Sequence, residues 1–200
     1  MKYVVVSGNP KKDGLTRKMT DEIIRGAKDG GAEVEEVSAY GMSYCRSCNG
    51  GAGQCLGDSH QCVFGKDGFT DAQEKIREAD AVAFISPVYW EEVSEGLKSF
   101  MDRFRRCESS GIFNQRKAAL TGKPVLIVAS AGGSGLDMIE PLKEMERFVH
   151  HTGGMVFDAI GINRWNQAYK GKTIYEAAKA IAEGVKVGET REYSTMTSRE

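Results

Sequence analysis

Apolar residues recur along the chain with two different periods, one typical of buried strands and one typical of amphipathic helices. The β-branched run Tyr3–Ser7 ends at a Gly-Asn-Pro turn, which predicts a buried strand. From about residue 15 to residue 28 every fourth position is apolar, as on the core-facing side of a helix: Leu15, Met19, Ile23 and Ala27. Gly30 and Gly31 then predict the C-terminal cap of that helix.

The same alternation of patterns continues along the chain. Further strands are predicted at residues 32–38, 80–90, 122–135 and 154–162. Helices are predicted at about 70–78, 91–106 and 173–186, and another helix follows the strand at 122–135 and ends at about 151. The core-facing positions of the third and fourth helices are Val93, Leu97, Phe100, Met101, Phe104, Ile139, Leu142, Met145 and Val149. Five mostly apolar strands that alternate with helices predict an α/β fold, with a doubly wound parallel sheet and helices on both faces.

Length and charge narrow the class of protein. The 200 residues suit one domain, expected over 1–188, followed by a polar tail at 189–200. A formal net charge of −1 offers no basic excess for nucleic acid. The longest apolar runs, 81–85 and 125–129, are too short to cross a membrane. We expect no signal peptide, a cytoplasmic location and reduced thiols.

Three strand-to-helix loops are the candidate binding elements, because a doubly wound sheet binds ligands at the carboxyl ends of its strands. Loop one, Ser7–Thr16, offers backbone amides, an amine and hydroxyls to a phosphate, or is an ordinary helix cap. Loop two begins at Ser86, and its Tyr89 and Trp90 could stack on a flat ring, cap the core or line a subunit interface. Loop three, Ser130–Gly135, lets the backbone approach a ligand, or is a plain turn.

Four of the five cysteines lie within eighteen residues, with the spacing Cys45-x2-Cys48-x6-Cys55-x6-Cys62. Four thiolates suffice for a [4Fe–4S] cluster or for tetrahedral Zn²⁺, and a segment without metal is the third possibility. His60 could replace one ligand, although a solvated loop histidine is the simpler interpretation. Cys107, at the end of a predicted helix, is interpreted as a lone structural or surface thiol.

Several of these segments together resemble the flavodoxin-like, NAD(P)H-dependent FMN reductases, and especially their iron-sulfur flavoprotein branch. The segment SGNPKKDGLT resembles the family's Gly-Ser-Pro-Arg-x-x-Gly-Asn-Thr opening, and CRSC with the later CVFGKDGF resembles its cysteine segment. ADAVAFISPVYW, LKSFMDR and LTGKPVLIVASAGGSG also match, so the resemblance covers about residues 1–160. Asn9, Leu15 and Gly68 stand where the family usually has Ser, Asn and Asp.

The resemblance implies a strand order of 2-1-3-4-5 and FMN bound at the strand ends. The phosphate would be held within residues 9–16, by Asn9, Lys11, Gly14, Leu15 and Thr16. The isoalloxazine ring would lie between loop two and loop three, against Pro87, Val88, Tyr89, Trp90, Ser130, Ala131, Gly132 and Gly133. Cys45, Cys48, Cys55 and Cys62 would be the ligands of a cluster. No side-chain acid or base is implied, because the flavin carries the redox chemistry.

The activity implied by the resemblance is an FMN-dependent oxidoreductase that takes electrons from NAD(P)H or from a reduced ferredoxin-like donor. Two other possibilities stay open beside it, namely an FMN-binding electron carrier and a plain FMN or quinone reductase without a cluster. A scaffold with a Zn²⁺-bound loop and no flavin is a further alternative. Related proteins suggest a homodimer or homotetramer.

Overall fold

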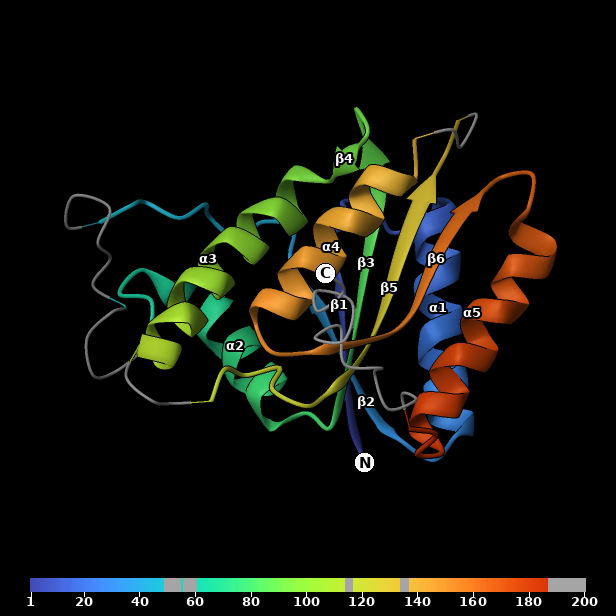
Figure 1. The fold of residues 1–200 in the computed structure, drawn as a ribbon. Coiled ribbons are helices and arrows are strands. Elements are labelled where there is room, and N and C mark those ends of the chain that lie inside the picture. The colour runs from blue at the N-terminus through green and yellow to red at the C-terminus, as the bar shows by residue number, and fades with distance from the viewer. Residues whose placement is uncertain (49–54, 56–60, 114–116, 134–136, 187–200) are drawn as a thin grey trace, which may run out of the picture.

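A computed structural model describes residues 1–48, 55, 61–113, 117–133 and 137–186. Its strands and helices alternate along the chain as the sequence predicts (Figure 1). The strands are β1 (Lys2–Ser7), β2 (Glu33–Ser38), β3 (Ala81–Tyr89), β4 (Glu92–Val93), β5 (Pro124–Ala131) and β6 (Met155–Asn163). The helices are α1 (Gly14–Asp29), α2 (Phe69–Glu78), α3 (Glu95–Phe113), α4 (Ile139–His151) and α5 (Gln167–Ala182), and a 3₁₀ turn, Gly65–Asp67, precedes α2.

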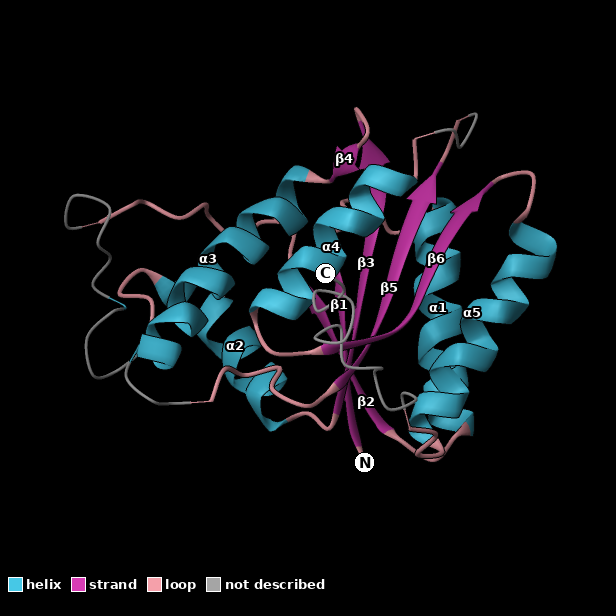
Figure 2. Cartoon of the chain, viewed as in Figure 1, coloured by secondary structure: helices cyan, strands magenta, loops and turns pink. Residues whose placement is uncertain are grey.

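The central sheet has the order β2-β1-β3-β5-β6, and all of these strands are parallel (Figure 2). This is the predicted 2-1-3-4-5 order once the short β4 is set aside, and the prediction is confirmed. Because the strands are parallel, the loops that follow β1, β3 and β5 emerge at the same edge of the sheet. The order places these three strands next to one another, so the three candidate loops are neighbours.

Side chains of successive strand residues point to opposite faces, and each face buries its own apolar core. Tyr3 and Val5 of β1 pack with α1 and α5, whereas Val4 and Val6 pack with α2, α3 and α4. In the core that contains Val4 and Val6, the rings of Phe84, Phe100, Phe104 and Phe148 pack in tilted and edge-on orientations at centroid distances of 5.3 to 5.8 Å. Both faces of the sheet are therefore covered, which explains why the inner strands β1, β3 and β5 are mostly apolar, whereas the edge strand β2 carries three glutamates.

Four details differ from the sequence-based expectations. Residues 92–93 form β4, antiparallel to β3, so the third helix begins at Glu95 and extends to Phe113. The last helix begins at Gln167 instead of 173, because its first turn is polar and carries no apolar period. Ile139 is 62% exposed, and Met138 takes the inward position beside Gly161. Leu15 is only partly buried.

The packing of α1 on α5 depends on a glycine, and this gives a prediction on stability. A Cβ atom added at Gly26 would lie 2.2 Å from the carbonyl oxygen of Tyr175, which is backbone and cannot give way. We expect Gly26→Ala to lower the free energy of unfolding by about 2 kcal/mol or more, since overpacking a tight core contact typically costs about 1–3 kcal/mol. Urea denaturation followed by circular dichroism measures this.

Gly171 is the matched control, because it lies in α5 on the same helix pair. A Cβ atom there would meet only the end of the Met19 side chain, at 3.5 Å, an ordinary contact. Alanine favours a helix over glycine by about 1 kcal/mol, so Gly171→Ala should leave the stability unchanged or raise it. Equal losses in the two variants would show that the close approach at Gly26 does not limit the packing.

Candidate functional site

The carboxyl ends of β1, β3 and β5 lie in register, which brings the three loops together. Ser7 pairs with Ile85 across β1 and β3, and Pro87 pairs with Ser130 across β3 and β5. Loop one therefore starts beside loop two, and loop two starts beside loop three. The candidate phosphate-binding and ring-binding residues of the sequence analysis thus lie along one sheet edge.

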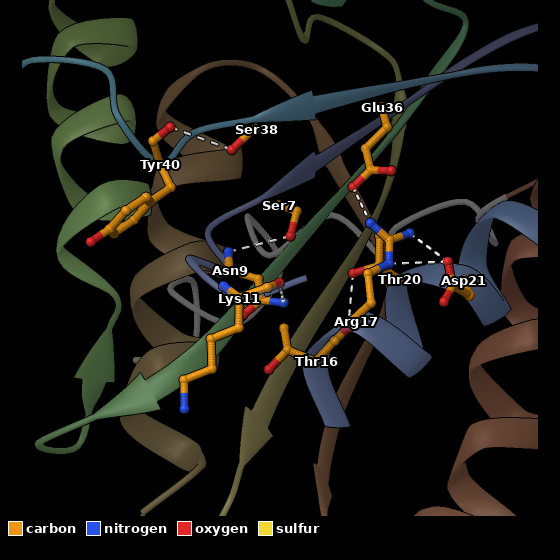
Figure 3. Close-up of polar contacts among 10 residues, drawn as sticks. All are labelled: Ser7, Asn9, Lys11, Thr16, Arg17, Thr20, Asp21, Glu36, Ser38 and Tyr40. Atoms are coloured by element: carbon orange, nitrogen blue, oxygen red, sulfur yellow. Dashed lines mark hydrogen bonds and ion pairs between the residues drawn. The ribbon is translucent and has the colours of Figure 1, made fainter. Parts of the chain in front are cut away.

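Asn9 shapes loop one through hydrogen bonds within the loop (Figure 3). Its Nδ2 donates to the carbonyl oxygen of Lys11 at 2.7 Å, and its Oδ1 accepts the Lys11 N–H at 3.2 Å. The Asn9 N–H donates to Ser7 Oγ at 3.3 Å. The Asn9 side chain is thus engaged with its own backbone, and its contribution to a phosphate site is the shape of the loop.

The start of α1 has the features of an anion site. Asp13 makes no side-chain hydrogen bond to the first amides of the helix, and the first turn carries no acidic residue. The Lys11 ammonium and the Thr16 hydroxyl have no hydrogen-bond partner among the described residues, and Figure 3 shows both beside this turn. The Leu15 side chain is partly buried and packs against the core of α1 and α5, and it has no polar group to offer a phosphate. Helix amides with a nearby amine and hydroxyl suit a phosphate group.

Ser94, which the sequence analysis did not single out, ties loop two to loop one. Its N–H donates to Ser86 Oγ at 2.8 Å, and its Oγ donates to the carbonyl oxygen of Gly8 at 2.7 Å. Ser86 Oγ in turn donates to the carbonyl oxygen of Pro87 at 2.8 Å. The bond from Ser94 to Gly8 joins residues 86 positions apart in the sequence, so no local pattern could have indicated it.

Loop two is a tight hairpin rather than the start of a helix. Tyr89 pairs with Glu92 across β3 and β4, and the two residues between them have φ values of 50° for Trp90 and 66° for Glu91. Positive φ at both central positions is the geometry of a type I′ turn, which glycine and asparagine normally occupy. The hairpin leaves Trp90 98% exposed at the strand ends, so Trp90 does not cap the core.

Loop three offers an unpaired polar atom and open backbone. The Ser130 hydroxyl is buried without a hydrogen-bond partner among the described residues. Among the described residues, no atom lies within 4 Å of a Cβ added at Gly132 or Gly133, so their backbone is open on that side. Arg164, another residue missed in the sequence, donates its Nε–H to the carbonyl oxygen of Gly132 at 2.7 Å. Residues 134–136 of this loop lie outside the described part of the chain.

All five cysteines line a single small cavity, of about 20 Å³, which we call the thiol cavity. Its lining consists of Cys45, Arg46, Cys48, Cys55, Cys62, Val63, Phe64, Arg103, Arg106 and Cys107. These described lining residues include three arginines and no carboxylate, so the cavity suits an anionic group. In the described part of the chain no three His, Cys, Asp or Glu side chains are arranged to hold a metal ion. His60 lies outside the described residues.

Cys107 belongs to this cavity, which corrects its interpretation as a lone thiol. It is 2% exposed on α3 and hydrogen-bonds to Cys55. This hydrogen bond lowers the pKa of the Cys55 thiol to about 7 and raises the pKa of Cys107 well above its ordinary value. With five thiols, the donor set around the cavity is soft and sulfur-rich, and these ligand types suit an iron-sulfur cluster or Zn²⁺.

Asp67, which follows the cysteine segment, is hydrogen-bonded to Ser43, which precedes it. Burial alone would raise the pKa of its carboxyl, but hydrogen bonds from Arg103 and from the Ser43 N–H and hydroxyl hold that pKa well below the ordinary 3.8. Both Ser43 donors lie 2.8 Å from Asp67 Oδ2. Gly68 follows with φ of 91°, a left-handed conformation that favours glycine and accounts for its presence at this position.

These contacts predict how stability depends on pH. Because the pKa of Asp67 is lower in the folded than in the unfolded chain, its stabilisation is complete above pH 3.8 and is lost as the pH falls further. Asp67→Asn should lower the stability at pH 7 and make the loss between about pH 4 and pH 2 shallower. Urea denaturation at pH 7 and pH 3 measures both. Glu146→Gln, at an exposed position of α4, is the control. An unchanged acid profile in Asp67→Asn would contradict the assignment.

Comparisons with known proteins agree with this arrangement. Residues 1–161 match the family described as NADPH-dependent FMN reductase. The iron-sulfur flavoprotein of Methanosarcina thermophila is 26% identical over 192 residues, which cover 92% of this chain and 94% of that protein. The iron-sulfur flavoprotein of Archaeoglobus fulgidus is 36% identical over 105 residues, which are 52% of this chain but only 45% of the relative.

Solved structures confirm the flavodoxin-like fold. An NADH:FMN oxidoreductase in its apo form superposes with a TM-score of 0.64 at 15% identity, over 90% of this chain and 88% of the other. A flavodoxin from the domain Archaea gives 0.59 at 19% identity, over 92% and 97%. No helix in the described ranges is long and apolar enough to cross a membrane. The match over residues 1–161, with the strand order and the three strand-end loops, shows that this chain belongs to the NADPH-dependent FMN reductase family.

Proposed function

We propose that this protein is an FMN-dependent oxidoreductase that takes electrons from NAD(P)H or from a reduced ferredoxin-like donor and passes them to an acceptor. The observation that carries the proposal is the sheet edge itself, where an uncapped helix start, an exposed aromatic hairpin and an unpaired buried hydroxyl lie on three neighbouring loops. Each supplies what one part of FMN needs. The name of the matching family supports the same cofactor and donor.

Each of the three loops would contact a different part of FMN. The amides at the start of α1, with Lys11 and Thr16, would hold the phosphate, and the α1 dipole would favour its negative charge. Tyr89 and Trp90 would cover the ring from the hairpin side. Ser130 and the open backbone of Gly132 and Gly133 would meet its other edge. Bound FMN would supply the redox chemistry by accepting a hydride and releasing electrons singly or in pairs.

We further propose that Cys45, Cys48, Cys55 and Cys62 bind a [4Fe–4S] cluster in the thiol cavity. Five thiols and three guanidiniums around one cavity match a thiolate-bound anionic group in ligand type and charge, and the cavity of about 20 Å³ would have to widen to admit it. Both relatives described above are named iron-sulfur flavoproteins. Helix α3 supports both sites, because Leu97 lies beside Gly8 of loop one and Cys107 lines the cavity. Ten residues of helix separate them, which is about 15 Å along its axis.

The experiment is purification of the full chain without oxygen, followed by measurement of flavin, iron, sulfide and zinc on one sample. About one FMN with about four irons per chain would support both proposals. FMN without iron would overturn the cluster, and zinc without iron would assign the thiols to Zn²⁺. No flavin after addition of FMN would overturn the oxidoreductase, and flavin that NAD(P)H does not reduce would favour an electron carrier.

Ser130→Ala tests the flavin site apart from the metal. We expect weaker FMN binding, since a hydrogen bond to a ligand group contributes about 0.5–1.5 kcal/mol, or roughly twofold to tenfold in affinity. The same change should not destabilise the flavin-free protein, because the hydroxyl it removes has no partner there among the described residues. Unchanged FMN affinity would place Ser130 outside the site.

A further inference from the structure

Arg103 is the most buried of the three arginines that line the thiol cavity. It lies on α3 with 1% exposure, and its guanidinium stacks over the ring of Phe69 at 4.1 Å. A buried guanidinium is costly unless its donors are satisfied, so the groups it contacts indicate what it is for.

These contacts lie on both sides of the cysteine segment. Before the segment, Nη1 donates to the carbonyl oxygen of Ser43 at 2.8 Å. After it, Nη1 donates to Asp67 Oδ2 at 2.8 Å, and Nη2 donates to the carbonyl oxygen of Phe64 at 3.3 Å. Ser43 also donates directly to Asp67, so Arg103 and Asp67 together join the two ends of the segment that contains Cys45 and Cys62.

One further contact reaches a sulfur atom. Nη2 of Arg103 lies 3.4 Å from Cys62 Sγ, within hydrogen-bonding distance for sulfur. Arg103 Nε is buried without a partner among the described residues. The contacts to oxygen atoms are enough to join the two ends of the cysteine segment. The bond to Cys62 Sγ is additional, and Cys62 is one of the residues that the proposed function assigns to the cluster.

We propose that Arg103 is a positioning residue for the cluster, fixing Cys62 Sγ and donating a hydrogen bond to it. This rests on the proposed function, since it takes Cys62 as a ligand. Hydrogen bonds to cluster sulfurs set the reduction potential, because they stabilise the more negative, reduced state. Arg103 should therefore hold the potential of the cluster higher than the same ligands would have without it.

The test is Arg103→Lys in the full chain, with the cluster reconstituted anaerobically from ferrous iron and sulfide. Lysine keeps the positive charge but cannot reach all of these acceptors with one ammonium group. Dithionite titration with mediators, followed by electron paramagnetic resonance, gives the one-electron potential. We expect reduction to become harder by about tenfold in its equilibrium constant, which is about 59 mV. Arg105→Lys, on the same helix but exposed, should leave the potential unchanged.

The outcomes separate the two proposals. A natural chain without iron would overturn the cluster and Arg103's role with it. A natural chain with iron, and equal potentials in both lysine variants, would overturn only the role of Arg103. A merely structural role would lower the iron content and stability of Arg103→Lys without moving the potential of the clusters that remain.

If Arg103→Lys does not fold, a measurement on chains with the natural Arg103 decides. Arginine labelled with ¹⁵N in its guanidinium should show a nuclear coupling to the reduced cluster by electron–nuclear double resonance. The measurement uses the Arg46→Lys, Arg106→Lys double background, because Arg46 and Arg106 also line the cavity. Absence of that coupling would overturn the proposal.

Discussion

Replacing any one of the four cysteines of the segment 45–62 with serine should reduce the bound iron from about four atoms per chain to less than one. A serine hydroxyl stays protonated at neutral pH and is a poor ligand for iron in a cluster, so one lost thiolate leaves the group open to solvent. The change is expected to be nearly complete for Cys62→Ser, which also loses the sulfur that Arg103 contacts. Iron and sulfide analysis after anaerobic reconstitution measures it.

Cys107→Ser is the matched control, because it removes a thiol from the same cavity but not from the segment 45–62. Cys107 lines the same cavity and hydrogen-bonds to Cys55, yet it comes from α3 rather than from the segment. We expect this variant to keep its iron. Loss of iron in Cys107→Ser, together with retention in one of the four segment variants, would show that Cys107 is a ligand and that the assignment from the segment alone is wrong.

Flavin content should be independent of iron content in these variants. The three loops at the sheet edge contain no cysteine, and the thiol cavity lies about 15 Å along α3 from loop one. Variants without iron should therefore bind FMN as the natural chain does. Parallel loss of FMN would instead indicate that the cysteine segment supports loop one.

The parallel sheet was predictable because its strands and helices carry strong local patterns. Tyr3–Val6 and Ala81–Ile85 are apolar at every position, as is typical of strands buried on both faces. The hairpin was not predictable, since β4 has two residues, too few for a period, and its turn places Trp90 and Glu91 at φ values that sequence preferences disfavour. Ile139 fits the helical period, but the adjacent Met138 fills the inward position.

The candidate site was predictable only as far as its parts are local. Loops one, two and three follow directly from the strands that precede them, so their positions at the sheet edge could be inferred. The links between them could not, because Ser94 contacts Gly8 across 86 residues. The same holds for Arg103, whose contacts with Ser43, Cys62 and Asp67 span 36 to 60 residues. Such pairs carry no signal in a single sequence.

Gly8→Ala is expected to weaken FMN binding by about fivefold or more, and this is the sharpest test of loop one. A Cβ atom at Gly8 would lie 2.5 Å from Ser94 Oγ and 2.7 Å from Leu97 Cβ, so loop one would have to move away from α3. That movement would also lengthen the hydrogen bond from Ser94 to the Gly8 carbonyl oxygen. Overpacking typically costs about 1–3 kcal/mol. If this cost falls on the FMN-bound conformation of the loop, it lowers the affinity for FMN roughly fivefold to more than a hundredfold.

The compensating variant separates a displaced loop from general unfolding. Gly8→Ala combined with Ser94→Ala removes the nearer of the two contacts while keeping the Leu97 contact, so it should recover part of the FMN affinity. Ser94→Ala alone should cost less than Gly8→Ala, because it removes hydrogen bonds without forcing the backbone to move. FMN titration followed by quenching of flavin fluorescence gives all three dissociation constants. If Gly8→Ala binds FMN as tightly as the natural chain, the cofactor does not rest on loop one, and the phosphate site must be sought elsewhere.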